Sequence, residues 1–234
     1  MKTLIIIPAY NEAKNIAGVI EDLRRFYPEG DYLVVNDCST DETEAVIRQI
    51  GVRHLTLPTN LGIGGCVQSG YRYAREYHYD FAVQFDGDGQ HMAQCIRDLL
   101  KPLEDGEADM AVGSRFLTKE GFLSTGMRRL GIGFLSRLLR ALCGIRVNDV
   151  TSGMRAVNRD IIRFFSEHYA QDYPEPESLL TAALRGARIV EVPVQMRERQ
   201  GGASSITPMR SVYYMIKVTL ALLLSSMEKE VGKK

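Results

Sequence analysis

The sequence predicts an α/β fold, built on a mostly parallel sheet with helices on both faces and followed by an apolar C-terminal helix. Short runs of β-branched and other apolar residues alternate with longer segments in which apolar residues recur every three or four positions. Alternation of strand and helix favours parallel strands that are buried on both faces. With 234 residues, 45% of them hydrophobic, the chain is long and apolar enough to enclose a full core.

The expected strands lie at residues 3–7, 32–36, 54–57, 81–85 and 110–113. The segment after the first strand carries the apolar stripe of one helical face, formed by Ile16, Val19, Ile20, Leu23 and Phe26. In the next helical segment, Ser39 or Thr40 is expected to cap a first turn that carries the acids Asp41, Glu42 and Glu44. We expect residues 1–205 to form the α/β domain and residues 206–234 to add the C-terminal helix.

The composition excludes several classes of protein. The formal net charge is zero, so the chain as a whole has no electrostatic attraction to nucleic acid, and no nucleic-acid partner is expected. The four cysteines lie far apart without a C-x-x-C pair, which argues against a zinc site or a disulfide framework and fits a reducing cytosol. The apolar run at the N-terminus has four residues before Pro8, so it is interpreted as a strand and not as a signal peptide.

Polar loops follow four of the expected strands. They comprise residues 8–12, 36–41, 58–65 and 86–91. Any single loop of this composition is explained by its turn alone, because Asn, Asp, Gly and Ser favour turn conformations of the backbone. Because the carboxyl ends of parallel strands share one crevice, where ligands bind in such folds, the four loops together predict a binding site.

The last of these loops, Asp86-Gly-Asp-Gly-Gln-His, follows an apolar strand directly. A calcium loop of the EF-hand type is excluded, because its sixth and twelfth positions would be His91 and Arg97. The glycines from Gly62 onward lack the lysine of a Walker loop and the third glycine of a dinucleotide fingerprint. What remains is a hard divalent cation held by one or two carboxylates and completed by substrate phosphate oxygens and water. We interpret His91 as a local hydrogen-bonding residue.

Five motifs carry a resemblance to a known family. They are Ile6-Ile-Pro-Ala-Tyr-Asn-Glu12, Val35-Asn-Asp-Cys-Ser-Thr-Asp41, Asn60-Leu-Gly-Ile-Gly-Gly65, Asp86-Gly-Asp-Gly-Gln-His91 and Gly113-Ser-Arg115. In this order the set resembles the family-2 inverting glycosyltransferases of GT-A fold, and within them the branch of dolichyl- and undecaprenyl-phosphate sugar synthases. The resemblance covers residues 3–205.

The resemblance implies a role for each of a set of residues. The nucleotide would be bound by Pro8, Tyr10, Glu12, Asp37, Gly62 and Asp86. A Mg²⁺ or Mn²⁺ ion bridging the diphosphate would be bound by Asp86, Asp88 and Gln90, with Asp88 assisting departure of the nucleoside diphosphate. The diphosphate or the acceptor phosphate would be held by Arg115, Arg128, Arg129, Arg199 and a closing loop with Ser204. Glu177 is the best match to the family's acidic residue near the acceptor, as a base or as a partner of a metal or arginine, although two prolines around Glu175 depart from the family pattern.

The second half of the chain indicates a lipid environment. Residues 121–148 contain five arginines and no acid among many leucines, which is typical of a helix lying on an anionic membrane, although a core helix with solvated arginines fits equally well. Residues 212–224 are almost entirely apolar but include Lys217 and fall short of the ~20 residues that span a bilayer. We expect this segment to lie at the membrane interface or against a small membrane-protein partner, with a closing core helix as the alternative. The protein would then associate peripherally with the inner face of the cell membrane.

The acceptor decides the expected mechanism. A polyprenyl monophosphate, with a second pKa of about 6, is already anionic and attacks without a base, whereas a sugar hydroxyl needs one. We expect a metal-dependent inverting glycosyltransferase that uses a nucleotide sugar, with UDP as the nucleotide, and transfers to an undecaprenyl-type phosphate. One alternative is transfer to a sugar hydroxyl in polysaccharide assembly, with Glu177 as the base. Another is a catalytically idle nucleotide-sugar-binding subunit that scaffolds a membrane partner.

Overall fold

The computed structural model describes residues 1–117, 126–197 and 208–231. Its centre is a seven-stranded sheet of order β3-β2-β1-β4-β6-β5-β7. The strands are β1 (Thr3–Ala9), β2 (Asp31–Asn36), β3 (His54–Thr56), β4 (Phe81–Gln84), β5 (Met110–Ser114), β6 (Arg155–Asn158) and β7 (Ile189–Pro193). β6 runs antiparallel to both of its neighbours, and every other pairing in this sheet is parallel.

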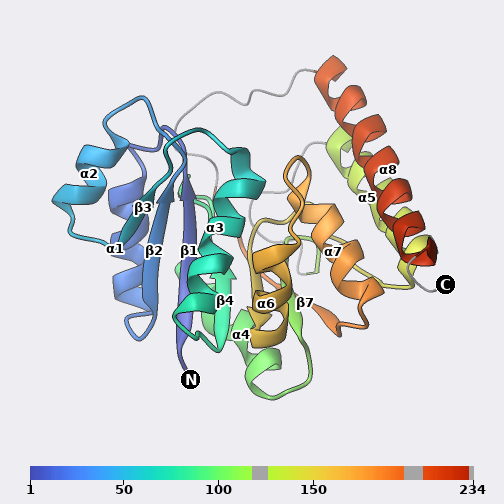
Figure 1. The fold of residues 1–234 in the computed structure, drawn as a ribbon, viewed down its shortest axis with the longest axis horizontal. Helices are drawn as coiled ribbons and strands as arrows, with labels where there is room; N and C mark the ends of the chain where they lie inside the picture. Colours follow the sequence, from blue (N-terminus) through green and yellow to red (C-terminus); the bar gives the residue numbers. More distant parts are fainter. Residues whose placement is uncertain (118–125, 198–207, 232–234) are drawn as a thin grey trace.

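Helices cover both faces of the sheet (Figure 1). They are α1 (Ile16–Phe26), α2 (Thr43–Gln49), α3 (Gly62–Glu76), α4 (Ile96–Glu104) after a 3₁₀ turn at Ala93–Cys95, α5 (Gly126–Cys143), α6 (Arg159–Glu167), α7 (Pro174–Leu184) and α8 (Pro208–Val231). Residues of β1 alternate between the faces, as the two-residue period of a strand requires. Leu4 and Ile6 pack in the cluster with α3, α6 and α7, and Ile5 and Ile7 pack in the cluster with α1 and α4.

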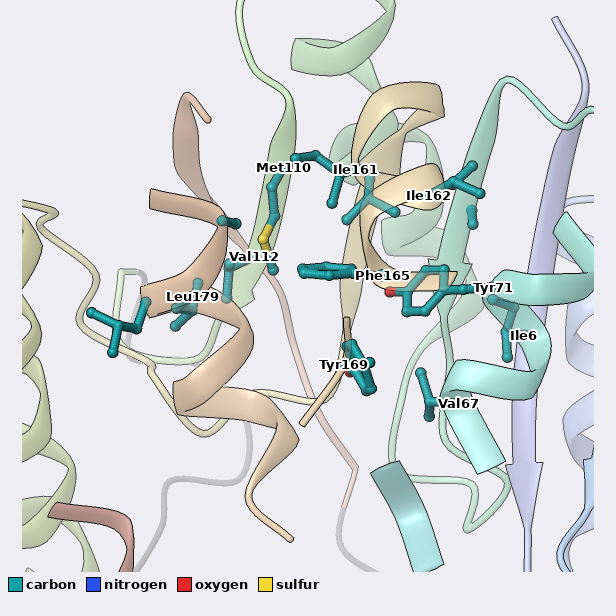
Figure 2. Close-up of a cluster of buried hydrophobic side chains, with 14 of the residues drawn as sticks. Ile6, Val67, Tyr71, Met110, Val112, Ile161, Ile162, Phe165, Tyr169 and Leu179 are labelled. Carbon is teal, nitrogen blue, oxygen red and sulfur yellow. The ribbon is translucent and has the colours of Figure 1, made fainter. Parts of the chain in front are cut away.

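An aromatic group fills the first of these clusters. Figure 2 shows Tyr71 of α3 beside Phe165 of α6 and Tyr169, together with Ile6 and Val67. Ring centroids of Tyr71 lie 5.4 Å from those of both Phe165 and Tyr169, in tilted and edge-on arrangements that aromatic rings prefer. This packing fixes α3 and α6 against the sheet below the edge that carries the polar loops.

The five expected strands and the helical stripe of residues 16–26 are confirmed. The predicted cap of the second helix was wrong: α2 begins at Thr43, after Asp41 and Glu42, and has no side-chain cap. The Asp41 carboxylate accepts the Thr43 backbone N–H at 2.9 Å, and Ser39 Oγ accepts the N–H of Asn11. The polar residues of this segment therefore join two loops and do not begin a helix.

The C-terminal helix α8 packs beside α5 and α7, at the side of the molecule away from α1 and α2 (Figure 1). Val218 and Leu222 are fully buried there, whereas Ile216, Leu220 and Leu224 are more than half exposed. One face of this segment thus joins the core, as the alternative of a closing core helix requires, and the other face is exposed. Contact of the exposed face with a membrane or a partner stays a prediction. Within residues 1–117, 126–197 and 208–231, no helix combines the length and the apolar content needed to cross a membrane.

Candidate active site

The candidate site lies at the edge of the sheet where β1, β2, β4 and β5 end. Because β6 runs in the opposite direction, its amino end reaches the same edge. The loops at residues 8–12, 36–41 and 86–91 therefore share this edge with residues 149–154, a segment that the sequence did not predict to take part.

The loop after β1 is tied to the loop after β2. Asn11 adopts a left-handed backbone conformation with φ 57°, and its Oδ1 accepts the N–H groups of Thr40 at 2.9 Å and Asp41 at 3.3 Å. The Asn11 N–H donates to Ser39 Oγ at 3.0 Å. Asparagine tolerates this conformation better than most residues, because its short side chain bonds locally. The two loops thus form one rim.

The three nucleotide-binding candidates on the first loop differ in exposure. Pro8 is buried in β1, whereas the Tyr10 side chain is 48% exposed at the rim. Glu12 is half-buried: its N–H donates to Thr43 Oγ1 at 2.8 Å, and its carboxylate accepts from Asn15 Nδ2 at 2.7 Å. Tyr10 is therefore the candidate of this loop whose ring is open to a ligand.

Asp37 and Gly62, distant in sequence, are brought together. Asp37 is 3% exposed, and its Oδ1 accepts the Leu61 N–H at 2.7 Å. Asn60 donates from Nδ2 to the Asp37 carbonyl at 3.2 Å. Gly62, with φ 73°, then begins α3. A side chain at Gly64 would lie 2.2 Å from the carbonyl oxygen of Ala170, so glycine is required for the close packing of this helix start.

Asp86 and Asp88 stand on one tight loop directly after β4. Both are half-exposed, and Asp88 Oδ1 accepts the Gln90 N–H at 3.0 Å. A Cβ at Gly87 would lie 2.9 Å from the carbonyl oxygen of Pro8, so this glycine lets the loop approach the end of β1. The two carboxylates are consequently presented beside the first nucleotide-binding loop.

The donor set of this loop fits a divalent cation that is shared with a substrate. The described residues contain no cluster of three or more histidine, cysteine, aspartate or glutamate side chains that could hold a metal. One or two carboxylates with phosphate oxygens and water are the coordination that Mg²⁺ commonly takes in nucleotide sites. The amide of Gln90 lies 3.4 Å from the carbonyl of Arg197, so this side chain faces the segment after β7.

His91, which ends the loop, is 2% exposed and packs edge-on against Phe85 at 5.3 Å. Its Nδ1 accepts the Asp86 N–H at 3.0 Å, which confirms the local hydrogen-bonding role expected from the sequence. Burial lowers the pKa of His91 to about 4, although the nearby negative charge of Asp88 opposes the shift. The imidazole is therefore neutral at physiological pH.

Arg115, predicted to contact phosphate, forms a buried ion pair with Asp149. Its Nε and Nη2 donate to the two carboxylate oxygens at 2.7 and 2.6 Å, and Nη2 also reaches Thr151 Oγ1 at 3.2 Å. Arg115 is 6% and Asp149 0% exposed. A bidentate pair of this kind is strong and directional. Arg115 thus anchors the segment that begins at Asp149, and this geometry gives no support to a direct phosphate contact.

Arg155 is a second buried arginine, which sequence reasoning missed. It is 1% exposed, and its guanidinium donates to the Ser152 carbonyl at 2.7 Å and to the Glu175 carbonyl and Ser178 Oγ at 2.6 Å each. These bonds join the segment before β6 to the first turn of α7. The site therefore has a fixed back wall that spans two elements.

At Gly153 the segment before β6 lies directly against the loop at residues 86–91, which we call the acidic loop. A Cβ built on Gly153 would lie 2.6 Å from Asp86 Oδ2, so no larger residue fits without moving the carboxylate. The signal in the sequence was the run from Asp149 to Arg155, where an acid, hydroxyls, a glycine and an arginine precede a short apolar stretch. This run has the same mixture of acidic, hydroxyl and glycine residues that marks the polar loops predicted to form the site.

The two glutamates of α7 face different neighbours. Residues two apart point to nearly opposite sides of a helix. Burial raises the pKa of Tyr169 well above its usual range, and the charges of Glu175 and Asp86 add to this rise. Burial also raises the pKa of Tyr173, with Glu177 among the acids that contribute. Glu175 and Asp86 are thus both near Tyr169, while Glu177 is near Tyr173, which contacts Tyr214 of α8.

The remaining phosphate-binding candidates are only partly described. Arg128 and Arg129 lie in the first turn of α5, and Arg129 is exposed. Arg199 and Ser204 lie outside the described residues. Their predicted contacts with phosphate stay predictions.

Comparisons with known proteins match this architecture. The model of "Glycosyl transferase family 2" matches residues 4–165. Undecaprenyl-phosphate mannosyltransferase of Micrococcus luteus is 33% identical over 219 residues, covering 88% of each chain. UDP-N-acetylglucosamine–dolichyl-phosphate N-acetylglucosaminyltransferase of Methanococcus voltae is 30% identical, covering 82% of this chain and 84% of the relative. The crystal structure of glucosyl-3-phosphoglycerate synthase from Mycobacterium tuberculosis with Mn²⁺, UDP and glucosyl-3-phosphoglycerate has a TM-score of 0.73 at 22% identity, covering 96% of this chain and 79% of that one.

The mixed sheet and the acidic loop at its carboxyl edge define an enzyme of GT-A fold. The chain belongs to glycosyltransferase family 2 and is a glycosyltransferase. The fold class and the family expected from the sequence are thereby confirmed.

Proposed function

We propose that this glycosyltransferase moves a sugar from a nucleotide sugar, with UDP as the nucleotide, to an undecaprenyl-type phosphate, with inversion and with Mg²⁺ or Mn²⁺. The observation that carries the proposal is the loop at residues 86–91, which presents two half-exposed carboxylates next to the end of β1. The names of the relatives support the acceptor class, since both transfer a sugar to a polyprenyl phosphate. One of these names includes UDP, and the structural neighbour was crystallised with Mn²⁺ and UDP.

Donor binding is the task of the rim and the acidic loop. Tyr10, exposed on the rim, offers a ring face to the nucleobase, and Asp37 fixes the start of α3 nearby. Asp86 and Asp88 would hold the divalent ion against the diphosphate. When bound, such an ion stabilises the negative charge that develops on the leaving diphosphate. Gly153 and His91 pack around Asp86 and keep its carboxylate at the edge of the sheet.

The acceptor phosphate needs cations and no general base. A phosphate monoester with a second pKa of about 6 is largely dianionic at neutral pH and attacks the anomeric carbon directly. Arginines hold such a group well because the guanidinium fork matches two phosphate oxygens. Arg128, Arg129 and Arg199 are the residues we propose for this contact, with Ser204 beside them.

The outer faces of α5 and α8 are proposed to rest on the membrane that holds the lipid acceptor. Leu130 is 77% exposed, and Ile216, Leu220 and Leu224, spaced at one helical turn, are 56%, 53% and 63% exposed. Exposed arginines of α5 lie nearby, and a basic amphipathic surface of this kind binds at the interface of anionic lipid. The protein would be peripheral on the cytoplasmic face, where a small membrane-protein partner could share the same helices.

The test of membrane contact is co-sedimentation with vesicles that contain an anionic lipid. The double variant Leu220→Glu, Leu224→Glu should lose vesicle binding, because two charges would enter the interface. Tyr77→Glu, which removes an exposed ring at the end of α3, is the control and should bind like the wild type. Equal binding of the double variant would remove α8 from the proposal.

The test of the reaction uses the purified chain with Mn²⁺, undecaprenyl phosphate in detergent, and a panel of UDP-sugars together with GDP-mannose. Nucleotide release and the mass of a lipid-linked product are followed together. A product that requires both the metal and the lipid supports the proposal and identifies the sugar and the nucleotide. Transfer to a soluble glycan with no lipid product would favour the sugar-hydroxyl alternative.

One observation favours that alternative. Burial, and then repulsion from Asp172, raises the pKa of Glu177. A raised carboxyl pKa is what a general base for a sugar hydroxyl requires. The alternative predicts that Glu177→Gln loses activity steeply, whereas a phosphate acceptor predicts a small effect.

A further inference from the structure

His91 packs beside Asp86 at the end of the loop at residues 86–91, and its ring nitrogens have no role yet in the proposed reaction. Its side chain is 0% exposed, and its backbone pairs with Met196 in an isolated antiparallel bridge. The neighbouring Gln90 carbonyl accepts the Arg197 N–H at 2.9 Å. The backbone at His91 is therefore paired with the segment after β7, and the imidazole packs against the ring of Phe85.

Both ring nitrogens of His91 face the same residue. Nδ1 accepts the Asp86 N–H at 3.0 Å, so it carries no proton, and in the neutral ring the proton is on Nε2. Nε2 lies 3.5 Å from Asp86 Oδ2. It is a buried atom for which the described residues offer no hydrogen-bond partner. A small rotation of the carboxylate would supply that partner.

Gly153 also lies against the Asp86 carboxylate. The site of a Cβ on Gly153 is 2.6 Å from Oδ2, and Gln84 Nε2 is 3.5 Å from Oδ1. The imidazole, the Gln84 amide and the backbone of Gly153 are therefore all close neighbours of this carboxylate. Gln84 and the imidazole each present an N–H to the carboxylate, and the N–H of the imidazole is a buried one without a hydrogen-bond partner among the described residues.

We propose that His91 is a positioning residue, whose Nε2–H orients the Asp86 carboxylate for the divalent ion and the nucleotide diphosphate. This role rests on the proposed function. A neutral donor suits the task because it fixes the carboxylate without placing a second cation beside the metal. Hydrogen bonds to a ligating carboxylate commonly change metal affinity by about 10–100-fold.

Two substitutions at His91 test the roles of its two ring nitrogens separately. His91→Asn keeps an acceptor close to Nδ1 for the Asp86 N–H but has no donor at the position of Nε2, because its side chain is too short to place its amide N–H there. His91→Gln places an amide N–H close to Nε2. The surface variant His168→Asn is the matched control, because His168 lies at the end of α6 with its side chain 64% exposed. Mn²⁺ binding in the presence of UDP is measured by the electron paramagnetic resonance signal of free Mn²⁺, and thermal unfolding is recorded for each variant.

The expected result is that His91→Asn binds Mn²⁺ about 10–100-fold more weakly than the wild type, that His91→Gln recovers most of the affinity, and that the control is unchanged. Unchanged affinity in His91→Asn would overturn the inference. So would an equal loss of affinity and of unfolding temperature in both His91 variants, since that is the result of lost packing alone. Failure of the wild type itself to bind Mn²⁺ with UDP would instead overturn the metal-dependent function on which the inference rests.

Discussion

The half of the site proposed to bind the donor, formed by the loops after β1, β2 and β4, is held differently from the half that carries Glu177, the acid predicted to lie near the acceptor. This second half, named here the acceptor half, is formed by Arg115, residues 149–155 and α7. In the donor half, short side chains such as that of Asn11 bond the backbone of a neighbouring loop, and glycines allow close approach. In the acceptor half, two buried arginines bond partners 34 and 20 residues away. Both halves thus join segments 20 or more residues apart, but the donor half is joined by short polar side chains at its rim and the acceptor half by buried guanidinium groups.

The comparison predicts that stability depends most on the acceptor half. Replacing Asp149 with Asn leaves Arg115 buried beside a neutral partner, and breaking a buried pair in this way costs about 3–5 kcal/mol. Urea unfolding of Asp149→Asn should show this loss. Glu44→Gln, which breaks an exposed pair with Arg48, should change the unfolding free energy by less than about 1 kcal/mol. Equal losses of unfolding free energy in the two variants would mean that the buried Arg115–Asp149 pair stabilises the fold no more than an exposed pair does.

Activity should depend most on the donor half. Asp88→Asn removes a charge that would hold the ion but keeps an oxygen for the Gln90 N–H, so the fold should persist. We expect turnover to fall by about 10²–10³-fold, the size of effect seen when one group that stabilises developing charge is removed. The assay is lipid-linked product formation, with the unfolding temperature as the control. Near-normal turnover would remove Asp88 from the mechanism.

Gly153 tests the contact between the two halves. In Gly153→Ala the new Cβ would meet Asp86 Oδ2 and displace it, so the acceptor-side change should weaken the donor site. We expect Mn²⁺ affinity in the presence of UDP to fall by about 10-fold, by analogy with other supports of a ligating carboxylate. Gly133→Ala, where a Cβ would meet nothing within 4 Å, is the matched control. Unchanged affinity in Gly153→Ala would mean that the wall does not position Asp86.

Glu177 gives the smallest expected effect. If the acceptor is a phosphate, Glu177→Gln should keep activity within about 10-fold, whereas loss of a general base would cost about 10²–10⁴-fold. The raised pKa has a consequence for stability: the native state holds this proton more tightly than the unfolded chain does. The unfolding free energy should therefore fall as pH rises from the usual glutamate pKa through the raised one. Urea unfolding between pH 4 and 7 should show this fall in the wild type and less of it in Glu177→Gln.

A residue could be predicted from the sequence where its signal lies in the residues next to it. Asp86 and Asp88 could be proposed as site residues because their spacing, glycines and preceding strand are all local signals. The Arg115–Asp149 pair and Arg155 were not, because their partners are decided by the fold and no spacing reveals them. β6 was missed because it is four residues long and begins with that buried arginine. α8 was ambiguous because it does belong to two environments, with Val218 inside and Leu220 outside.

The central claim is that the loop at residues 86–91 and the nucleotide diphosphate share one divalent ion. It is tested most directly by the electron paramagnetic resonance spectrum of Mn²⁺ bound to the protein with UDP that carries ¹⁷O in its diphosphate. The account predicts that ¹⁷O broadens the Mn²⁺ lines in the wild type and that Asp88→Asn binds the ion far more weakly. Bound Mn²⁺ without broadening, or equal binding in Asp88→Asn, would contradict it.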